Sequence, residues 1–389
     1  MTTEARPGLR HIPDPPGITR ARTLPAAAYS DPTVFQRERR EVFGTGWIGA
    51  GVVDELPPRG SWVARTVAGT PLLFVADREG THRAFLNVCR HRAAPLCDDG
   101  CDGSGSFIRC PYHSWIYRLD GSLVKANGVG DPEGFDVADY PLKEVGLSLW
   151  RRLVFVNLGL VLRAGAASGE APLRLGPLAD AVEACRWEDM ELVLHESHER
   201  RFNWKVLLEN YSENYHTPFV HPEIDTTATE DYPMVSDGVV LYAWDRLKRP
   251  GEAADEVVRA TLLPGEPGWE RLFAAATVRP YDVGSYLSIW PNVMLNIFPD
   301  AVLAMWLEPL DAATTVVERR LYVLPGRNAE EVQSIIDAHT LVHQQDVDIC
   351  HAVQRSHNAG LDADGVLATV EERGVYWIHE LWRAALGQS

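Results

Sequence analysis

Two short motifs in the first third of the chain each pair a cysteine with a histidine. Cys89 and His91 form the pattern C-x-H, and Cys110 and His113 form the pattern C-x-x-H. Two tight loops with such ligands can close on a tetrahedral zinc ion, or on a [2Fe–2S] cluster in which two histidines replace two cysteines on one iron. The spacing leaves both options open. A third interpretation, buried cysteines beside incidental histidines, requires these four residues to fall in this order by accident.

A second set of metal-ligand residue types lies near the middle of the chain. If the segment around Glu209 is a helix, then Glu209, Glu213 and His216 stand at positions i, i+4 and i+7 and share one face. Pro218 is predicted to end this helix, so that the chain turns and brings His221 back toward His216. Two histidines across a helix end can chelate one metal ion, which then needs a third ligand.

A carboxylate in a late helix is the candidate third ligand. Residues 328–354 are predicted to form this helix, because apolar residues recur there in steps of three and four. An unpaired buried carboxylate is costly, so Asp346 needs a cation or hydrogen-bond donors. With His216 and His221 it would complete the triad of non-haem Fe(II) enzymes that activate dioxygen. The alternative is that Asp346 pairs with an arginine and that the histidines are merely packed. The predicted inward stripe of the helix is Val332, Ile335, Ile336, His339, Val342, Asp346, Ile349, Cys350 and Val353.

Short β-rich segments surround the cysteine–histidine motifs. They are rich in β-branched and aromatic residues and are separated by glycine, aspartate and proline turn signals, which predicts an all-β module over residues 46–160 with the four ligands on loops at one end. A helical lead over residues 1–45 precedes it, and small residues and prolines at 160–178 predict a domain boundary. The predicted segments are residues 34–43 for a helix and 61–67, 71–76, 84–88 and 153–157 for strands, with a polar connection over 98–106.

Composition limits the classes of function that fit. The chain of 389 residues is long enough for two domains, and its net charge of −17 argues against nucleic acid as a partner, because phosphate contacts need clustered Lys and Arg. No apolar run is long enough to cross a bilayer, and residues 1–7 lack the apolar core of a secretory signal, so we expect a cytoplasmic protein without membrane contact. Six cysteines are too few for a disulfide framework. Cys97 and Cys101 lie in the same loop and could pair, but we expect free thiols.

These motifs, in this order, resemble the catalytic (alpha) subunits of Rieske non-haem iron oxygenases, the aromatic-ring-hydroxylating family. The resemblance rests on residues 90–97 and 113–115 in the two cluster loops, on residues 203–221, and on residues 344–346. It implies an α+β fold, with an all-β Rieske [2Fe–2S] domain and a catalytic domain over residues 161–389, which has an antiparallel sheet flanked by helices. It also implies two ligand sets: Cys89, His91, Cys110 and His113 for the cluster, and His216, His221 and Asp346 for Fe(II).

One residue departs from the common family pattern. Many members have an aspartate three residues before the first iron-binding histidine, where this chain has Glu213. The resemblance implies that this carboxylate bridges the iron site of one subunit to a cluster histidine of its neighbour, here His113, in a homo-oligomer (trimer). A glutamate at this position is similar to the branch that oxidises quaternary ammonium compounds.

The resemblance implies a terminal oxygenase component, a mono- or dioxygenase that uses O₂ and electrons from NAD(P)H. We find no G-x-G-x-x-G after a strand and no second four-cysteine pattern, so we expect a separate NAD(P)H-dependent reductase or ferredoxin to deliver the electrons. The substrate would be a small aromatic or quaternary ammonium compound, hydroxylated or oxidatively demethylated. Candidate pocket strands are residues 286–290, 293–298 and 304–306, where Trp290 or Trp306 could hold a cation or a ring.

Two other classes of function compete with the oxygenase. A Rieske-type electron-transfer protein without oxygenase activity would bind no metal at His216, His221 and Asp346. A zinc-binding interaction module would contain zinc and no sulfide at the cysteine–histidine loops.

Overall fold

The computed structural model describes residues 10–11, 17–162, 173, 175, 185–222, 234–236, 238–245, 284–298, 300–369 and 371–387. The chain divides into two units, one of residues 39–173 and one of residues 1–38 with 174–389. Most of the predicted boundary at 160–178 lies outside the described residues.

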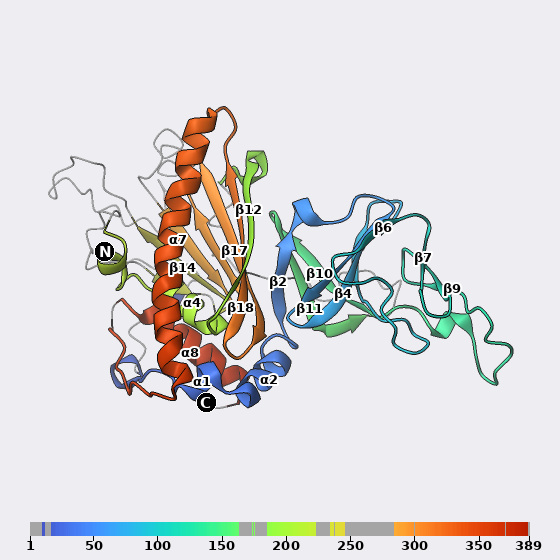
Figure 1. The fold of residues 1–389 in the computed structure, drawn as a ribbon, viewed down its shortest axis with the longest axis horizontal. Coiled ribbons are helices and arrows are strands. Elements are labelled where there is room, and N and C mark those ends of the chain that lie inside the picture. The colour runs from blue at the N-terminus through green and yellow to red at the C-terminus, as the bar shows by residue number, and fades with distance from the viewer. Residues whose placement is uncertain are drawn as a thin grey trace. The chain divides into compact units, whose positions relative to one another are not determined.

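The unit of residues 39–173 is built from antiparallel strands (Figure 1). Its larger sheet has the order β2-β11-β10-β5-β4-β3-β6, and a smaller sheet has the order β7-β8-β9. The strands are β2 (Trp47–Val52), β3 (Ser61–Val67), β4 (Thr70–Ala76), β5 (His82–Leu86), β6 (Asp102–Ser104), β7 (Phe107–Arg109), β8 (Ile116–Arg118), β9 (Leu123–Lys125), β10 (Glu144–Trp150) and β11 (Leu153–Leu162). All four predicted strands are confirmed, and β11 extends beyond its predicted end because Val161 and Leu162 pair with β10.

The segment between the two ligand loops corrects one prediction. Cys97 and Cys101, expected as free thiols, form a disulfide with a Cα–Cα distance of 5.9 Å. The reason is a tight turn in which the backbone N–H of Cys101 donates to the carbonyl of Asp98 at 3.0 Å, just before β6 pairs with β3. Residue counting could not show this turn, so it could not show that the two sulfurs meet.

The second unit is organised around an antiparallel sheet with the order β1-β13-β14-β15-β16-β17-β18-β12. Helix α7 runs along one face of this sheet, and α4 lies between α7 and the strands in the view of Figure 1. The strands are β1 (Arg10–His11), β12 (Glu191–Arg200), β13 (Met234–Ser236), β14 (Val240–Asp245), β15 (Gly284–Ile289), β16 (Val293–Ile297), β17 (Ala301–Asp311) and β18 (Thr314–Val323). The helices are α1 (Ala27–Ser30), α2 (Pro32–Glu41), α4 (Trp204–Tyr211), α5 (Thr217–Val220), α7 (Ala329–Asn358) and α8 (Arg373–Ala385).

Helix α7 begins at a capping box, in which Asn328 and Glu331 each accept the other's backbone N–H. The helix is confirmed, but its predicted inward stripe is partly wrong. Ile349 and Val353 are exposed, so the buried stripe lies about one residue away from the predicted one along the chain. This shift places Asp346 at the flank of the stripe. The buried residues of α7 are Ile335, His343, Val347, Cys350 and Gln354.

A buried ion pair connects α2 to α4, and α8 contributes a hydrogen bond to it. The Lys205 ammonium donates to Glu38 at 2.5 Å, and the indole N–H groups of Trp204 and Trp382 donate to the same carboxylate at 3.0 and 2.6 Å. Burial lowers the pKa of Lys205 below its usual value, and the Glu38 charge only limits that shift. Because each charge has a partner, burial of the pair is tolerated, and loss of either residue would leave an uncompensated charge.

The predicted α+β class is confirmed by these two units. Among the described residues, no helix is both long enough and apolar enough to span a bilayer.

Candidate functional site

The two cysteine–histidine motifs adopt the same local backbone turn. In the first loop, the Cys89 N–H donates to the Ala94 carbonyl at 2.8 Å, and in the second, the Cys110 N–H donates to the Trp115 carbonyl at the same distance. Each turn contains one residue with positive φ, Ala93 at 57° and Ser114 at 56°. The repeated turn presents each cysteine and its histidine on one side of the loop.

The two loops bring their four ligand side chains together. The Nδ1 atoms of His91 and His113 lie 3.2 Å apart, while the Cys89 and Cys110 thiols lie in the core of the unit at 2% and 1% exposure. Burial raises the pKa of the Cys89 thiol, and the neighbouring Cys110 adds to the rise. Two buried sulfurs and two imidazoles that face each other are the donor set of a Rieske cluster.

Tyr117 is a residue of this region that the sequence analysis missed. Its hydroxyl lies 3.3 Å from the Cys89 sulfur and accepts the Arg90 backbone N–H at 3.0 Å. It lies on β8 at the fourth position after His113, so nothing in its spacing marks it as a neighbour of Cys89. A hydroxyl that donates to a ligand sulfur raises the reduction potential of an iron–sulfur cluster, because it stabilises the added electron.

The segment before the candidate iron ligands departs from the predicted single helix. Helix α4 ends at Tyr211, and a loop leads to the short helix α5, so Glu213 and His216 lie in the loop. Pro218 does not end a helix but lies in the first turn of α5. This position is favourable for proline, because the backbone N–H groups of the first turn have no partner within the helix. Glu209 is therefore not on the face of His216.

The two carboxylates of this segment have different partners. The Glu209 carboxylate accepts the Tyr29 hydroxyl at 2.8 Å and lies 3.3 Å from Nε2 of His379. The Glu213 carboxylate lies 2.5 Å from Nδ1 of His216 and also accepts the backbone N–H groups of Tyr215 and His216. Only the second carboxylate of the pair therefore acts on a candidate metal ligand.

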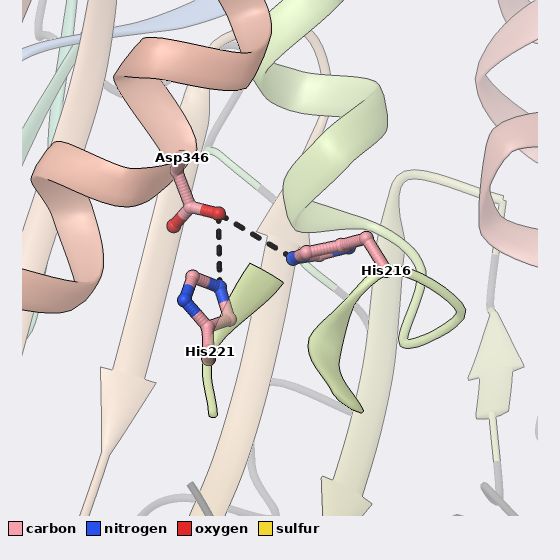
Figure 2. Close-up of side chains that lie close together, drawn as sticks. All are labelled: His216, His221 and Asp346. Atoms are coloured by element: carbon pink, nitrogen blue, oxygen red, sulfur yellow. Dashed lines mark hydrogen bonds and ion pairs between the residues drawn. The ribbon is translucent and has the colours of Figure 1, made fainter. Parts of the chain in front are cut away.

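The three candidate iron ligands converge (Figure 2). Their ligand atoms lie within 4.8 Å of one another, with Oδ1 of Asp346 at 3.1 Å from Nε2 of His221 and at 3.4 Å from Nε2 of His216. The histidines flank α5 and the aspartate projects from α7. Among the described residues, the ion-pair partners of Asp346 are His216 and His221. The alternative, in which Asp346 pairs with an arginine, is therefore not what the structure shows.

Both imidazoles are oriented through the nitrogen that faces away from Asp346. Nδ1 of His216 lies at 2.5 Å from Glu213, and Nδ1 of His221 lies at 2.6 Å from Oε1 of Gln345. Because each acceptor requires a proton on Nδ1, the Nε2 lone pairs are left for a metal ion. The role of Gln345 was not predicted, although it directly precedes Asp346 on α7.

The electrostatics of the triad favour a bound cation. Burial alone would lower the pKa of His216, but Asp346 and Glu213 outweigh burial and raise it to about 9. Burial alone would raise the pKa of Asp346, but its hydrogen bonds with the two histidines lower it. A carboxylate that holds protons on neighbouring imidazoles offers a divalent metal ion the same charge, and metal binding would displace those protons.

One predicted pocket residue faces away from the helices. Ser288 and Met305 lie on the sheet face toward α4 and α7, because Ser288 hydrogen-bonds to Ser212 at the end of α4. Trp306 follows Met305 and therefore points to the opposite face, where the Arg320 guanidinium lies 4.8 Å from its ring. Trp306, predicted as a residue that could hold a cation or a ring, therefore lies on the sheet face opposite α4 and α7.

The chain matches two family descriptions, "Ring hydroxylating alpha subunit (catalytic domain)" over residues 187–388 and "Rieske [2Fe-2S] domain" over residues 46–141. It is 27% identical to the carnitine monooxygenase oxygenase subunit of Escherichia coli strain K12, over 92% of each chain. It is 28% identical to the glycine betaine monooxygenase oxygenase subunit of Chromohalobacter salexigens, over 91% of this chain and 83% of that protein.

Solved structures share the fold. A quaternary ammonium Rieske monooxygenase in complex with L-carnitine matches with a TM-score of 0.71 and 22% identity, over 96% of this chain and 99% of that chain. Naphthalene 1,2-dioxygenase from Rhodococcus sp. matches with a TM-score of 0.67 and 19% identity, over 94% of each chain.

The catalytic-domain match excludes the pure electron carrier, and the Rieske match excludes the zinc module. The expected cofactors, a [2Fe–2S] cluster and a mononuclear Fe(II), are those of the two matched domains. The chain therefore belongs to the family of ring-hydroxylating alpha subunits, as an iron-dependent oxygenase with a Rieske domain.

Proposed function

We propose that this oxygenase oxidises a quaternary ammonium compound at a mononuclear Fe(II) held by His216, His221 and Asp346. The observation that supports the metal site most directly is the convergence of these three side chains within 4.8 Å. When bound, the Fe(II) supplies activation of O₂, and the cluster supplies stored electrons.

The protein's own contribution to this centre is orientation. Glu213 and Gln345 hold the two Nδ1 protons, which keeps both Nε2 atoms directed at one point. His221 is 2% exposed, so solvent has little access to the metal from its side. Two neutral imidazoles and one carboxylate would hold the Fe(II), which would supply O₂ activation at this site.

We propose Cys89, His91, Cys110 and His113 as the cluster ligands. Their burial is asymmetric, because both thiols are buried whereas His91 is exposed and His113 is half-buried. Electron transfer needs a short path to the partner, and an exposed imidazole edge supplies one. A separate NAD(P)H-dependent reductase or ferredoxin is the proposed source of the electrons.

We further propose a homo-oligomer, a trimer, in which Glu213 connects His216 to the partner subunit's His113. Support comes from two exposed aromatic side chains beside the metal loop, Tyr215 at 54% and Phe219 at 79% exposure. Apolar groups with this exposure next to a metal site favour burial against another subunit. The domain bounds 1–45, 46–160 and 161–389 and a cytoplasmic location stay predictions.

The substrate class rests on the relatives and on charge. Carnitine and glycine betaine monooxygenase oxygenase subunits are among the relatives that match more than nine-tenths of this chain. A net charge of −17 favours cationic over anionic ligands at long range. Hydroxylation of a carbon bound to a quaternary nitrogen gives an unstable hemiaminal-type (carbinolamine) product, so the expected outcome is cleavage of that C–N bond, which releases a tertiary amine and a carbonyl compound.

A substrate panel tests this proposal. Purified protein, a surrogate NAD(P)H-dependent reductase and O₂ are combined with L-carnitine, glycine betaine, choline, a methoxybenzoate or naphthalene. We expect NAD(P)H oxidation, O₂ uptake and carbonyl product to match one to one for at least one quaternary ammonium compound. Coupled turnover with the arenes alone would contradict the proposed substrate class while leaving the iron site intact.

A further inference from the structure

Ser212, the residue that follows α4, is held between the sheet and α8. Its side chain is 3% exposed and its hydroxyl lies 2.8 Å from that of Ser288 on β15. Its backbone N–H donates to the carbonyls of Leu208 and Glu209 at 3.1 and 3.0 Å. Side chain and backbone are thus both engaged, so Ser212 is a fixed point from which the metal-binding loop departs.

The third contact of Ser212 comes from Gly374 in the first turn of α8. A Cβ atom built on Gly374 would overlap the Ser212 carbonyl oxygen, far inside the 3.0 Å that real Cβ atoms respect, and would lie 2.9 Å from Leu241 on β14. Leu241 and Ser288 are register partners on neighbouring strands. Ser212 therefore packs on this pair of residues, and Gly374 packs against both Ser212 and Leu241. Glycine destabilises a helix relative to alanine, so a glycine at this position needs a physical reason, and the close approach of the Ser212 carbonyl supplies one.

Movement of Ser212 would reach His216 through a rigid link. Glu213 accepts the backbone N–H groups of Tyr215 and His216 and also contacts the His216 ring, so residues 213–216 are closed on one carboxylate. His221 is oriented from another element, because Gln345 of α7 holds it. The triad is thus assembled from two separately supported parts.

We infer that Gly374 is a positioning residue for the metal site: by admitting the Ser212 carbonyl, it sets the distance of His216 from His221 and Asp346. The inference rests on the proposed metal site. A side chain at position 374 must displace α8 or the loop by roughly 1 Å, and metal and catalytic geometry tolerates only about half of that.

The test measures metal affinity of the folded protein. The mononuclear site of the cluster-loaded protein is emptied with a chelator and titrated anaerobically with Co(II), whose visible spectrum reports coordination. We expect Gly374→Ala to raise the dissociation constant at least about tenfold, as loss of a support beyond the ligands typically does. Ser288→Ala, which removes a hydrogen bond without a clash, should raise it about threefold. Gly46→Ala is the matched control, because nothing lies within 4 Å of its added methyl group, and should bind Co(II) as the wild type does.

Cluster absorbance and circular dichroism verify that each variant is folded. Wild-type Co(II) affinity in folded Gly374→Ala would overturn the inference. If Gly374→Ala does not fold, wild-type affinity in Ser288→Ala would overturn it. Failure of the proposed metal site itself gives a different result, namely equal Co(II) binding by the wild type and His221→Ala.

Discussion

The two candidate metal-ligand sets of this chain are built in opposite ways. The cysteines and histidines of the cluster region lie within residues 89–113, on two loops with the same turn and the same hydrogen bond. The triad joins His216 and His221 to Asp346, and 125 positions separate His221 from that carboxylate. The first set depends on local backbone geometry, whereas the second depends on the packing of α4, α5 and α7.

The two candidate sites also differ in the solvent exposure of their histidines. In the cluster region the imidazole of His91 is exposed, whereas in the triad His221 is 2% exposed. A centre that exchanges electrons with other proteins needs an accessible edge, and a centre that activates O₂ works better where water is excluded. The comparison predicts that substitutions at the triad abolish the reaction without disturbing the cluster.

The largest expected effect is that of Asp346→Ala. The variant should lose the mononuclear iron and reduce product formation by at least about 10³-fold, because two imidazoles alone are a poor site for Fe(II). Iron analysis and product assay should show a retained cluster spectrum with no turnover. Wild-type turnover in this variant would remove Asp346 from the site.

Glu213→Gln is expected to have the next largest effect. The amide preserves shape, so both metal centres should remain loaded, but the charge that orients His216 and is proposed to reach the partner subunit's His113 is lost. We expect turnover to fall about 100-fold, measured as slow reoxidation of the reduced cluster with substrate and O₂. Glu209→Gln is the control, because Glu209 contacts Tyr29 and His379 instead. Equal effects of the two variants would contradict the role assigned to Glu213.

Gln345→Leu should weaken metal binding about tenfold, since it removes the acceptor for Nδ1 of His221. Gln344→Leu is the neighbouring control, because the exposed Gln344 hydrogen-bonds to Asp348 and not to a ligand. The measurement is Co(II) titration of the chelator-treated protein. If both variants bind alike, orientation of His221 does not depend on Gln345.

The smallest expected effect is on stability and concerns His343, the buried histidine of α7. Burial, aided by the Arg319 charge, lowers the pKa of His343 from 6.5 to about 3. Below pH 6.5 the unfolded chain therefore binds a proton at this histidine, whereas the folded chain does not. The neutral His343 thus leaves stability undiminished above pH 6.5, and stability is lost as pH falls from 6.5 toward 3. At pH 5 it removes about 2 kcal/mol of the free energy of unfolding. Denaturant unfolding at pH 7.5 and 5 should show a smaller loss for His343→Leu than for the wild type, and equal losses would contradict this account.

The cluster region could be predicted from the sequence because its ligands are local. Its strands and loops follow from short-range patterns, whereas the disulfide between Cys97 and Cys101 depends on a turn that composition does not reveal. The triad was predictable as a set of residue types, but the single helix through Glu209 and His216 was not correct. That prediction failed because α4 ends at Tyr211 and a loop, which contains Glu213 and His216, separates it from α5.

Supports of the site were harder to predict than its ligands. Gln345, Ser212 and Gly374 act through contacts between elements far apart in the chain, and their residue types are common in other roles. Their roles follow only from tertiary packing. Pattern and spacing therefore nominate the candidate ligands, and the structure is needed to find the residues that orient them.

The most direct test of the account is the iron and acid-labile sulfide content of the purified, cluster-loaded protein and of its His221→Ala variant. Two different iron centres in one chain predict about three iron atoms and two sulfides for the wild type, and about two iron atoms with unchanged sulfide for the variant. About two iron atoms in both proteins, after anaerobic loading with Fe(II), would contradict the claim that this chain holds an electron store and a separate O₂-activating iron.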